Sequence, residues 1–130
     1  MIIQIATELT YVPKWNSNRD LPADEQIVAH YKVISIKDKG RVLKKPDVEF
    51  QYDPAGQVKG GSVAISFDRK PVIAAMLTRL DNCGWKDKTG EHAIIRAIDF
   101  DEAPTAFDSL ADELGEFFRS ELEKKLDEKN

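Results

Sequence analysis

The sequence predicts an α+β fold in which amphipathic helices cover an antiparallel sheet. Residues 26–36 are rich in β-favouring types, and residues 48–52 and 63–67 alternate large apolar with small or polar side chains. From residue 70 onward, apolar residues recur with helical spacing instead. Strands first and helices last are typical of α+β domains. We therefore expect an N-terminal antiparallel sheet of three or four strands with one covered face.

Length and composition favour a single domain over residues 1–130. The chain has 130 residues, of which 42% are hydrophobic and 32% are charged, enough for a packed core. Its one cysteine, Cys83, excludes an internal disulfide and a multi-cysteine zinc site. No apolar run approaches the roughly 20 residues that span a bilayer, and the start lacks a signal-peptide pattern. We expect a cytoplasmic protein without a membrane partner.

The first strands are expected over residues 2–12 and 26–36. Residues 13–22 predict an irregular loop, because proline and short polar side chains divert the backbone from sheet ladders. Trp15 stands in this polar stretch, and we expect it to fix the loop to the core. The strand over 26–36 is expected to be buried on much of both faces and to end in a turn at 37–40.

The alternating segments predict a β-hairpin of residues 48–52 and 63–67. A period of two places the large apolar side chains of each segment on one face. The intervening residues contain proline and three glycines, which favour a long connecting loop.

Two amphipathic helices are predicted to follow, over about 70–83 and 105–126. Asp68 is placed to cap the first, and Gly84 is placed to end it. The second carries an apolar stripe with acidic residues near its start and lysines near its end, which matches the helix dipole. Residues 87–90 predict a turn, and the short apolar run 91–98 fits a helix or a strand equally. Residues 127–130 are expected to form a frayed tail.

Charge is distributed unevenly along the chain. Residues 1–98 carry 15 basic and 12 acidic side chains, whereas residues 99–130 carry 4 and 11. A basic patch contains one acid, Asp38, among six bases: Lys32, Lys37, Lys39, Arg41, Lys44 and Lys45. Such asymmetry marks a nucleic-acid or protein partner surface, although most charge runs are simply solvated.

Few residues suggest catalysis or metal binding. The two histidines, His30 and His92, have no second ligand at a metal-binding spacing, and His30 is expected to be a hydrogen-bonded core or sheet residue. Cys83 is expected in the last turn of a helix, whose negative end disfavours a thiolate. The acids at 99–102 are followed by Ala103 and Pro104 rather than by a calcium-loop glycine, so they fit a helix N-terminus better. We expect no enzyme, no cofactor and no metal site.

The terminal helix and the basic patch are the candidate binding surfaces. An apolar stripe too wide for a small sheet to cover would be a docking site, whereas a fully covered stripe would be core. Both interpretations remain open at this point. The candidate partner-binding residues are Leu114, Phe117, Phe118 and Leu122 on the stripe, with Lys37, Arg41, Lys44 and Lys45 on the patch.

Two stretches of the sequence resemble small tail assembly proteins of long-tailed bacteriophages. Residues 11–28 (YVPKWNSNRDLPADEQIV) are similar to the opening of those proteins. Residues 80–91 (LDNCGWKDKTGE) and 110–118 (LADELGEFF) are similar to their end. Together these stretches and their surroundings cover about half of the chain.

The resemblance implies a non-enzymatic chaperone of phage tail assembly in the bacterial host cytoplasm. Its partners would be the tape-measure protein, which it keeps soluble, and tail-tube subunits, and it could also form homo-oligomers. One alternative is a structural component of the virion such as a head–tail adaptor. A further alternative is a small nucleic-acid-binding module that uses Lys32–Lys45, which the acidic total charge and the aromatic positions disfavour.

Overall fold

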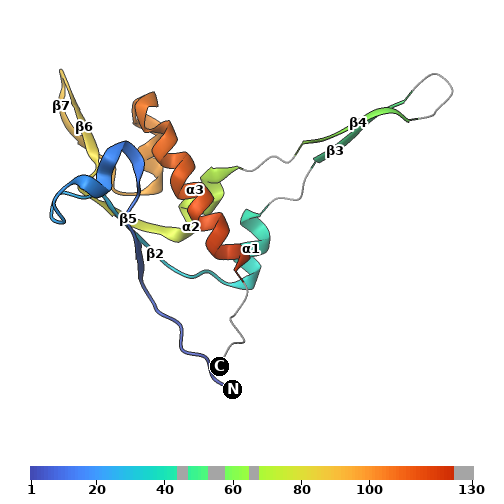
Figure 1. The fold of residues 1–130 in the computed structure, drawn as a ribbon, viewed down its shortest axis with the longest axis horizontal. Coiled ribbons are helices and arrows are strands. Elements are labelled where there is room, and N and C mark those ends of the chain that lie inside the picture. Colours follow the sequence, from blue (N-terminus) through green and yellow to red (C-terminus); the bar gives the residue numbers. More distant parts are fainter. Residues whose placement is uncertain (44–46, 53–57, 65–67, 125–130) are drawn as a thin grey trace.

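The computed structural model describes residues 1–43, 47–52, 58–64 and 68–124. Three strands form an antiparallel sheet in the order β1–β2–β5: β1 (Leu9–Tyr11), β2 (Val28–Tyr31) and β5 (Leu77–Asp81). Helical segments lie between these strands and after them in the chain, so the predicted α+β class is confirmed (Figure 1).

The first two strands are shorter than predicted. Of residues 2–12 only β1 is a strand, and residues 1–8 leave the sheet as an extended, exposed segment, hereafter the N-terminal arm. The predicted burial of 26–36 on much of both faces holds only within β2, where buried Ala29 and Tyr31 alternate with partly buried neighbours. Beyond β2 it is wrong, because Val33 is 52% exposed and Ile36 is 91% exposed.

A short helix, α1 (Ile36–Val42), replaces the predicted turn at 37–40. Ser35 caps it, since its Oγ accepts a hydrogen bond from the Asp38 backbone N–H at 3.1 Å. The outward side of this helix carries Ile36, Lys37 and Arg41, whereas Val42 faces the core.

Two strands, β3 (Asp47–Tyr52) and β4 (Val58–Ala64), pair antiparallel with Val48 opposite Val63. An antiparallel hairpin is therefore confirmed, but its predicted second strand is not, because residues 48–52 pair with 58–63 and, of the expected 63–67, only residue 63 lies opposite them. The connecting loop is accordingly shorter than predicted, and residues 65–67 lie outside the described residues. The hairpin is a separate two-stranded sheet and lies apart from the helices in Figure 1. The expectation that the helices cover it is wrong.

The helix predicted over 70–83 is only half as long. Asp68 does cap α2 (Arg69–Met76), accepting from the Lys70 backbone N–H at 3.1 Å, but the chain then enters β5 directly. Its apolar residues 73, 76, 77 and 80 are all buried, and β5 pairs with β2 instead of prolonging the helix.

After β5 the chain forms a second hairpin, β6 (Gly84–Asp87) and β7 (Gly90–Ala93), around the predicted turn. The Ile94 N–H donates to the Cys83 carbonyl at 2.9 Å and the Leu80 N–H to the Ile95 carbonyl at 2.7 Å. These bonds place residues 94–95 beside β5. Residues 91–98 are thus neither one strand nor one helix, since β7 ends at Ala93 and a 3-10 helix runs over Ala97–Glu102.

The terminal helix α3 (Asp108–Glu123) is shorter than the predicted 105–126. A single 3-10 turn, Thr105–Phe107, precedes it. Leu126 and the predicted tail at 127–130 lie outside the described residues. α3 packs against α2, and its inward residues join the core with those of α2, β2 and β5. Within the described ranges, no helix has the length and apolar character needed to cross a bilayer.

Trp15 anchors its loop, as predicted. It lies in the 3-10 segment Trp15–Asp20, where its Nε1 donates to Ser109 Oγ at 2.8 Å and its ring lies 5.1 Å from that of Phe107. The loop is thereby attached to the start of α3.

Candidate functional site

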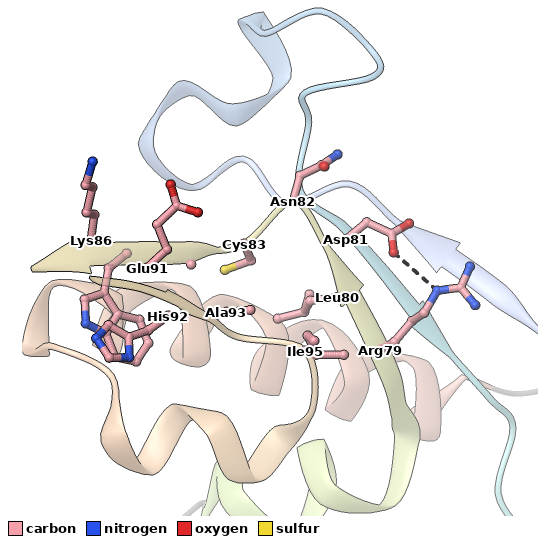
Figure 2. Close-up of a pocket in the computed structure, with 12 residues that line it drawn as sticks. Arg79, Leu80, Asp81, Asn82, Cys83, Lys86, Glu91, His92, Ala93 and Ile95 are labelled. Carbon is pink, nitrogen blue, oxygen red and sulfur yellow. Dashed lines mark hydrogen bonds and ion pairs between the residues drawn. The ribbon is translucent and has the colours of Figure 1, made fainter. Parts of the chain in front are cut away.

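An open groove of about 990 Å³ lies where β5 continues into β6 (Figure 2). Apolar residues such as Leu80, Ala93 and Ile95 line it between charged side chains. At one end Arg79 Nε and Asp81 Oδ1 pair at 3.2 Å, and at the other Lys86 and Glu91 occupy opposite positions of the hairpin. Its positive and negative charges therefore largely offset one another.

Cys83 in this groove is not an activated nucleophile. Its side chain is buried, and burial raises the pKa of the thiol to about 11. The residue lies between β5 and β6, so its predicted position in the last turn of a helix is wrong. The conclusion that this thiol is unreactive is supported by burial instead.

His92 has neighbours that superficially resemble a catalytic triad. Asp87 Oδ1 and Thr89 Oγ1 lie 3.0 and 2.9 Å from His92, but both contact the same nitrogen, Nε2. A proton relay needs the acid and the hydroxyl on opposite ring nitrogens, so this arrangement cannot activate the threonine. Bonds from Thr89 and then His92 hold the pKa of Asp87 well below its usual range. The network stabilises the hairpin turn.

His30 lies in a second polar cluster on the less buried face of β2. Its Nε2 is 2.7 Å from Asp81 Oδ2 and its Nδ1 is 3.2 Å from Glu8 Oε1. The hydrogen bond to His30 is the largest cause lowering the pKa of Asp81, and Arg79 adds to it. The predicted role as a hydrogen-bonded sheet residue is confirmed.

Three further acidic residues, Asp99, Asp112 and Glu113, have structural partners. Asp99 accepts from the Arg96 and Ile95 backbone N–H groups, which lower its pKa and cap a 3-10 helix, as expected for a helix N-terminus. Asp112 pairs with Arg69, whereas Glu113 accepts from the Tyr11 hydroxyl and the Lys14 backbone N–H. Among the described residues, no three or more His, Cys, Asp or Glu side chains gather as metal ligands.

The apolar stripe of α3 belongs to the core. Leu114 and Phe118 are fully buried, so their side chains do not form an exposed docking surface. Phe117 is partly covered by Tyr11, with ring centroids 3.8 Å apart, and Leu122 also packs against the core. Of the two interpretations of the stripe, the structure favours the covered one.

The basic patch is only partly described. Lys37 and Arg41 are exposed on α1, and Arg41 pairs with Asp38 at 3.2 Å, whereas Lys44 and Lys45 lie outside the described residues. Tyr31 is buried and donates to Glu121 at 2.8 Å, so its ring is not available to stack on a base.

The N-terminal arm carries exposed apolar residues that the sequence reasoning assigned to a strand. Ile2 is 99% exposed, Ile3 48% and Ile5 54%. Two features of the sequence could have indicated an exposed apolar arm instead of a strand. Residues 1–7 contain no charged side chain, and their isoleucines follow no strict alternation. Ile36 of α1, 91% exposed, is a further apolar residue in water.

Comparison of the chain with family models, with curated protein sequences and with solved structures gives no match.

Proposed function

We propose that this chain is a non-enzymatic protein that binds other protein chains during assembly of a bacteriophage tail, as a chaperone. The phage setting rests on the resemblance of residues 11–28, 80–91 and 110–118. The mode of binding rests on the exposed isoleucines of the N-terminal arm. The surface proposed for partner binding is thus the arm rather than α3.

The exposure of the arm is the single observation that carries the proposal. Burying an isoleucine side chain against a partner releases about 1.5–3 kcal/mol. The binding free energy available from the arm is a few times this value, because it carries Ile2, Ile3 and Ile5. None of the three belongs to the chain's own core in the described residues. The three isoleucines lie within four consecutive residues, and clusters of exposed apolar side chains mark protein-binding sites.

The other candidate sites, at Cys83, at His92 and at the carboxylates of α3, suit a binding protein better than an enzyme. In the described part of the chain, the thiol is buried, His92 meets its acid and hydroxyl on one nitrogen, and the carboxylates of α3 are directed to different partners. None of these arrangements combines a nucleophile, a base and an accessible cavity.

The test is co-purification with the tape-measure protein of the same phage or prophage. Co-expressed with the tagged chain, this protein is expected to remain soluble and to elute with it. The triple variant Ile2→Ser, Ile3→Ser, Ile5→Ser is expected to retain less than about a tenth of the partner, because about 1.4 kcal/mol of lost binding is already tenfold. The matched control is the double variant Leu21→Ser, Ile98→Ser, which removes exposed apolar residues outside the arm.

Equal retention by the triple variant would remove the arm from the proposal. Wild-type protein that leaves the tape-measure protein insoluble would contradict the chaperone function itself. Detection of the chain in purified virions would favour the head–tail adaptor instead.

A further inference from the structure

His30 joins the root of the N-terminal arm to the sheet. Glu8 is the last residue of the arm, and Asp81 lies in β5 on the other side of β2. The imidazole ring lies between their two carboxylates, with one ring nitrogen facing each, and its side chain is only 13% exposed.

The nitrogen that faces Asp81 carries a hydrogen. A carboxylate only accepts, so the 2.7 Å contact between Asp81 Oδ2 and Nε2 requires an Nε2–H donor. Arg79 Nη2 also approaches Nε2, at 3.4 Å, but a guanidinium only donates and cannot bond to a nitrogen that is itself donating. The shorter contact decides the assignment.

The contact with Glu8 therefore depends on a second proton. A neutral ring with its hydrogen on Nε2 presents a lone pair at Nδ1, and this lone pair would face the Glu8 carboxylate at 3.2 Å. Only the doubly protonated ring carries a positive charge, with which it donates to Asp81 and forms an ion pair with Glu8. We infer that His30 is a pH-operated latch on the N-terminal arm: the protonated ring ties Glu8 to the sheet, and loss of the Nδ1 proton weakens this tie.

The charges around the ring favour this behaviour. Arg79 lies 3.2 Å from Asp81 and 3.9 Å from Glu8, so with protonated His30 two cations balance two carboxylates. Lys32, two residues along the chain from His30, lines a small cavity with Glu8 and Arg79. Deprotonation removes one of these positive charges, but Arg79 and Lys32 remain. The latch is consequently weakened rather than abolished.

The latch controls how freely the root of the arm moves. Its consequence for partner binding rests on the proposed function, whereas the latch itself does not.

The experiment is an NMR titration of the full chain without any partner. The ring protons of His30 report its protonation, and amide protection factors at residues 7–9, corrected for intrinsic exchange, report the arm root. We expect protection to rise about two- to fivefold as the ring becomes protonated, the range of partly exposed ion pairs. The two transitions should have the same midpoint.

Two variants separate the latch from other pH effects. In Glu8→Gln the side-chain amide can accept from a protonated Nδ1 or donate to a neutral one, so the change in arm protection is expected to disappear. His92→Gln removes the other histidine and is expected to leave the transition unchanged.

Arm protection that stays constant while His30 titrates, or a transition that persists in Glu8→Gln, would overturn the latch. Because no partner is present, failure of the latch is distinguishable from failure of the tape-measure co-purification.

Discussion

The terminal helix α3 and the N-terminal arm are both rich in large apolar residues, yet their surroundings are opposite. Leu110, Leu114 and Phe118 are completely buried, whereas Ile2 is 99% exposed. The α3 residues repeat every three or four positions, so one helix face meets α2 and the sheet. The arm has no such surface opposite it in the described structure. Apolar residues of similar hydrophobicity thus stabilise the fold in one region and remain available for binding in the other.

The largest expected effect tests this comparison directly. Phe118→Ala is expected to lower the free energy of unfolding by about 3–5 kcal/mol, because it opens a cavity in a fully packed core. Ile3→Ala, which truncates an exposed side chain, is expected to change it by less than about 0.5 kcal/mol. Urea unfolding followed by circular dichroism measures both. A large cost for Ile3→Ala would show that the arm packs on the body of the protein.

Two glycines sharpen the contrast between tight and open positions. A Cβ on Gly84 would lie 2.3 Å from the His92 carbonyl oxygen, so Gly84→Ala is expected to force β6 and β7 apart and cost about 1–3 kcal/mol. A Cβ on Gly40 in α1 would meet no atom within 4 Å, and Gly40→Ala is expected to stabilise the protein by about 0.5–1 kcal/mol. Thermal unfolding of the two single variants should give shifts of opposite sign.

A pH-dependent effect of about 1 kcal/mol is expected at the contact between β1 and α3. The Tyr11 hydroxyl donates to Glu113 at 2.6 Å, and burial followed by this bond raises the pKa of Tyr11 from 10.0 to about 12. The folded state therefore keeps this proton where the unfolded chain loses it. The stability contribution is complete below about pH 10 and is lost as the pH rises to about 12.

Tyr11→Phe isolates this contribution from those of Tyr31 and Cys83, whose pKa values are also raised. The difference in unfolding free energy between wild type and variant is expected to be about 1 kcal/mol at pH 9 and to shrink as the pH rises from 10 to 12. A difference independent of pH would show that the hydroxyl is not held in this way.

Features with a local cause were predictable. Examples are the cap of α2 by Asp68, the turn at 87–90, the pairing of β3 with β4 and the anchoring of Trp15. The first three depend on residues near one another in the chain, and the last depends on one large hydrophobic side chain. The start of α1 also had a local signal, because Ser35 and Asp38 stand at a capping distance. The isoleucines at 34 and 36 concealed it by favouring a strand.

Features with a distant cause were not predictable. The apolar spacing at 73, 76, 77 and 80 fits a helix, and only pairing with β2 turns Leu77–Asp81 into a strand. In the same way, an apolar stripe looks identical in sequence whether or not another element covers it, so the burial of Leu114 and Phe118 required the structure. The cluster of Glu8, His30 and Asp81 joins three segments that the sequence separates widely.

By itself, the sequence determined the α+β class, the helical character of the C-terminal region and the lack of a recognisable catalytic motif. These follow from periodicity, capping and residue types, which act over a few residues. Only the tertiary structure decided which apolar side chains are covered and which acids face His30. Burial and ion pairing depend on which distant segment of the chain packs against a residue, and a local sequence pattern does not specify that segment.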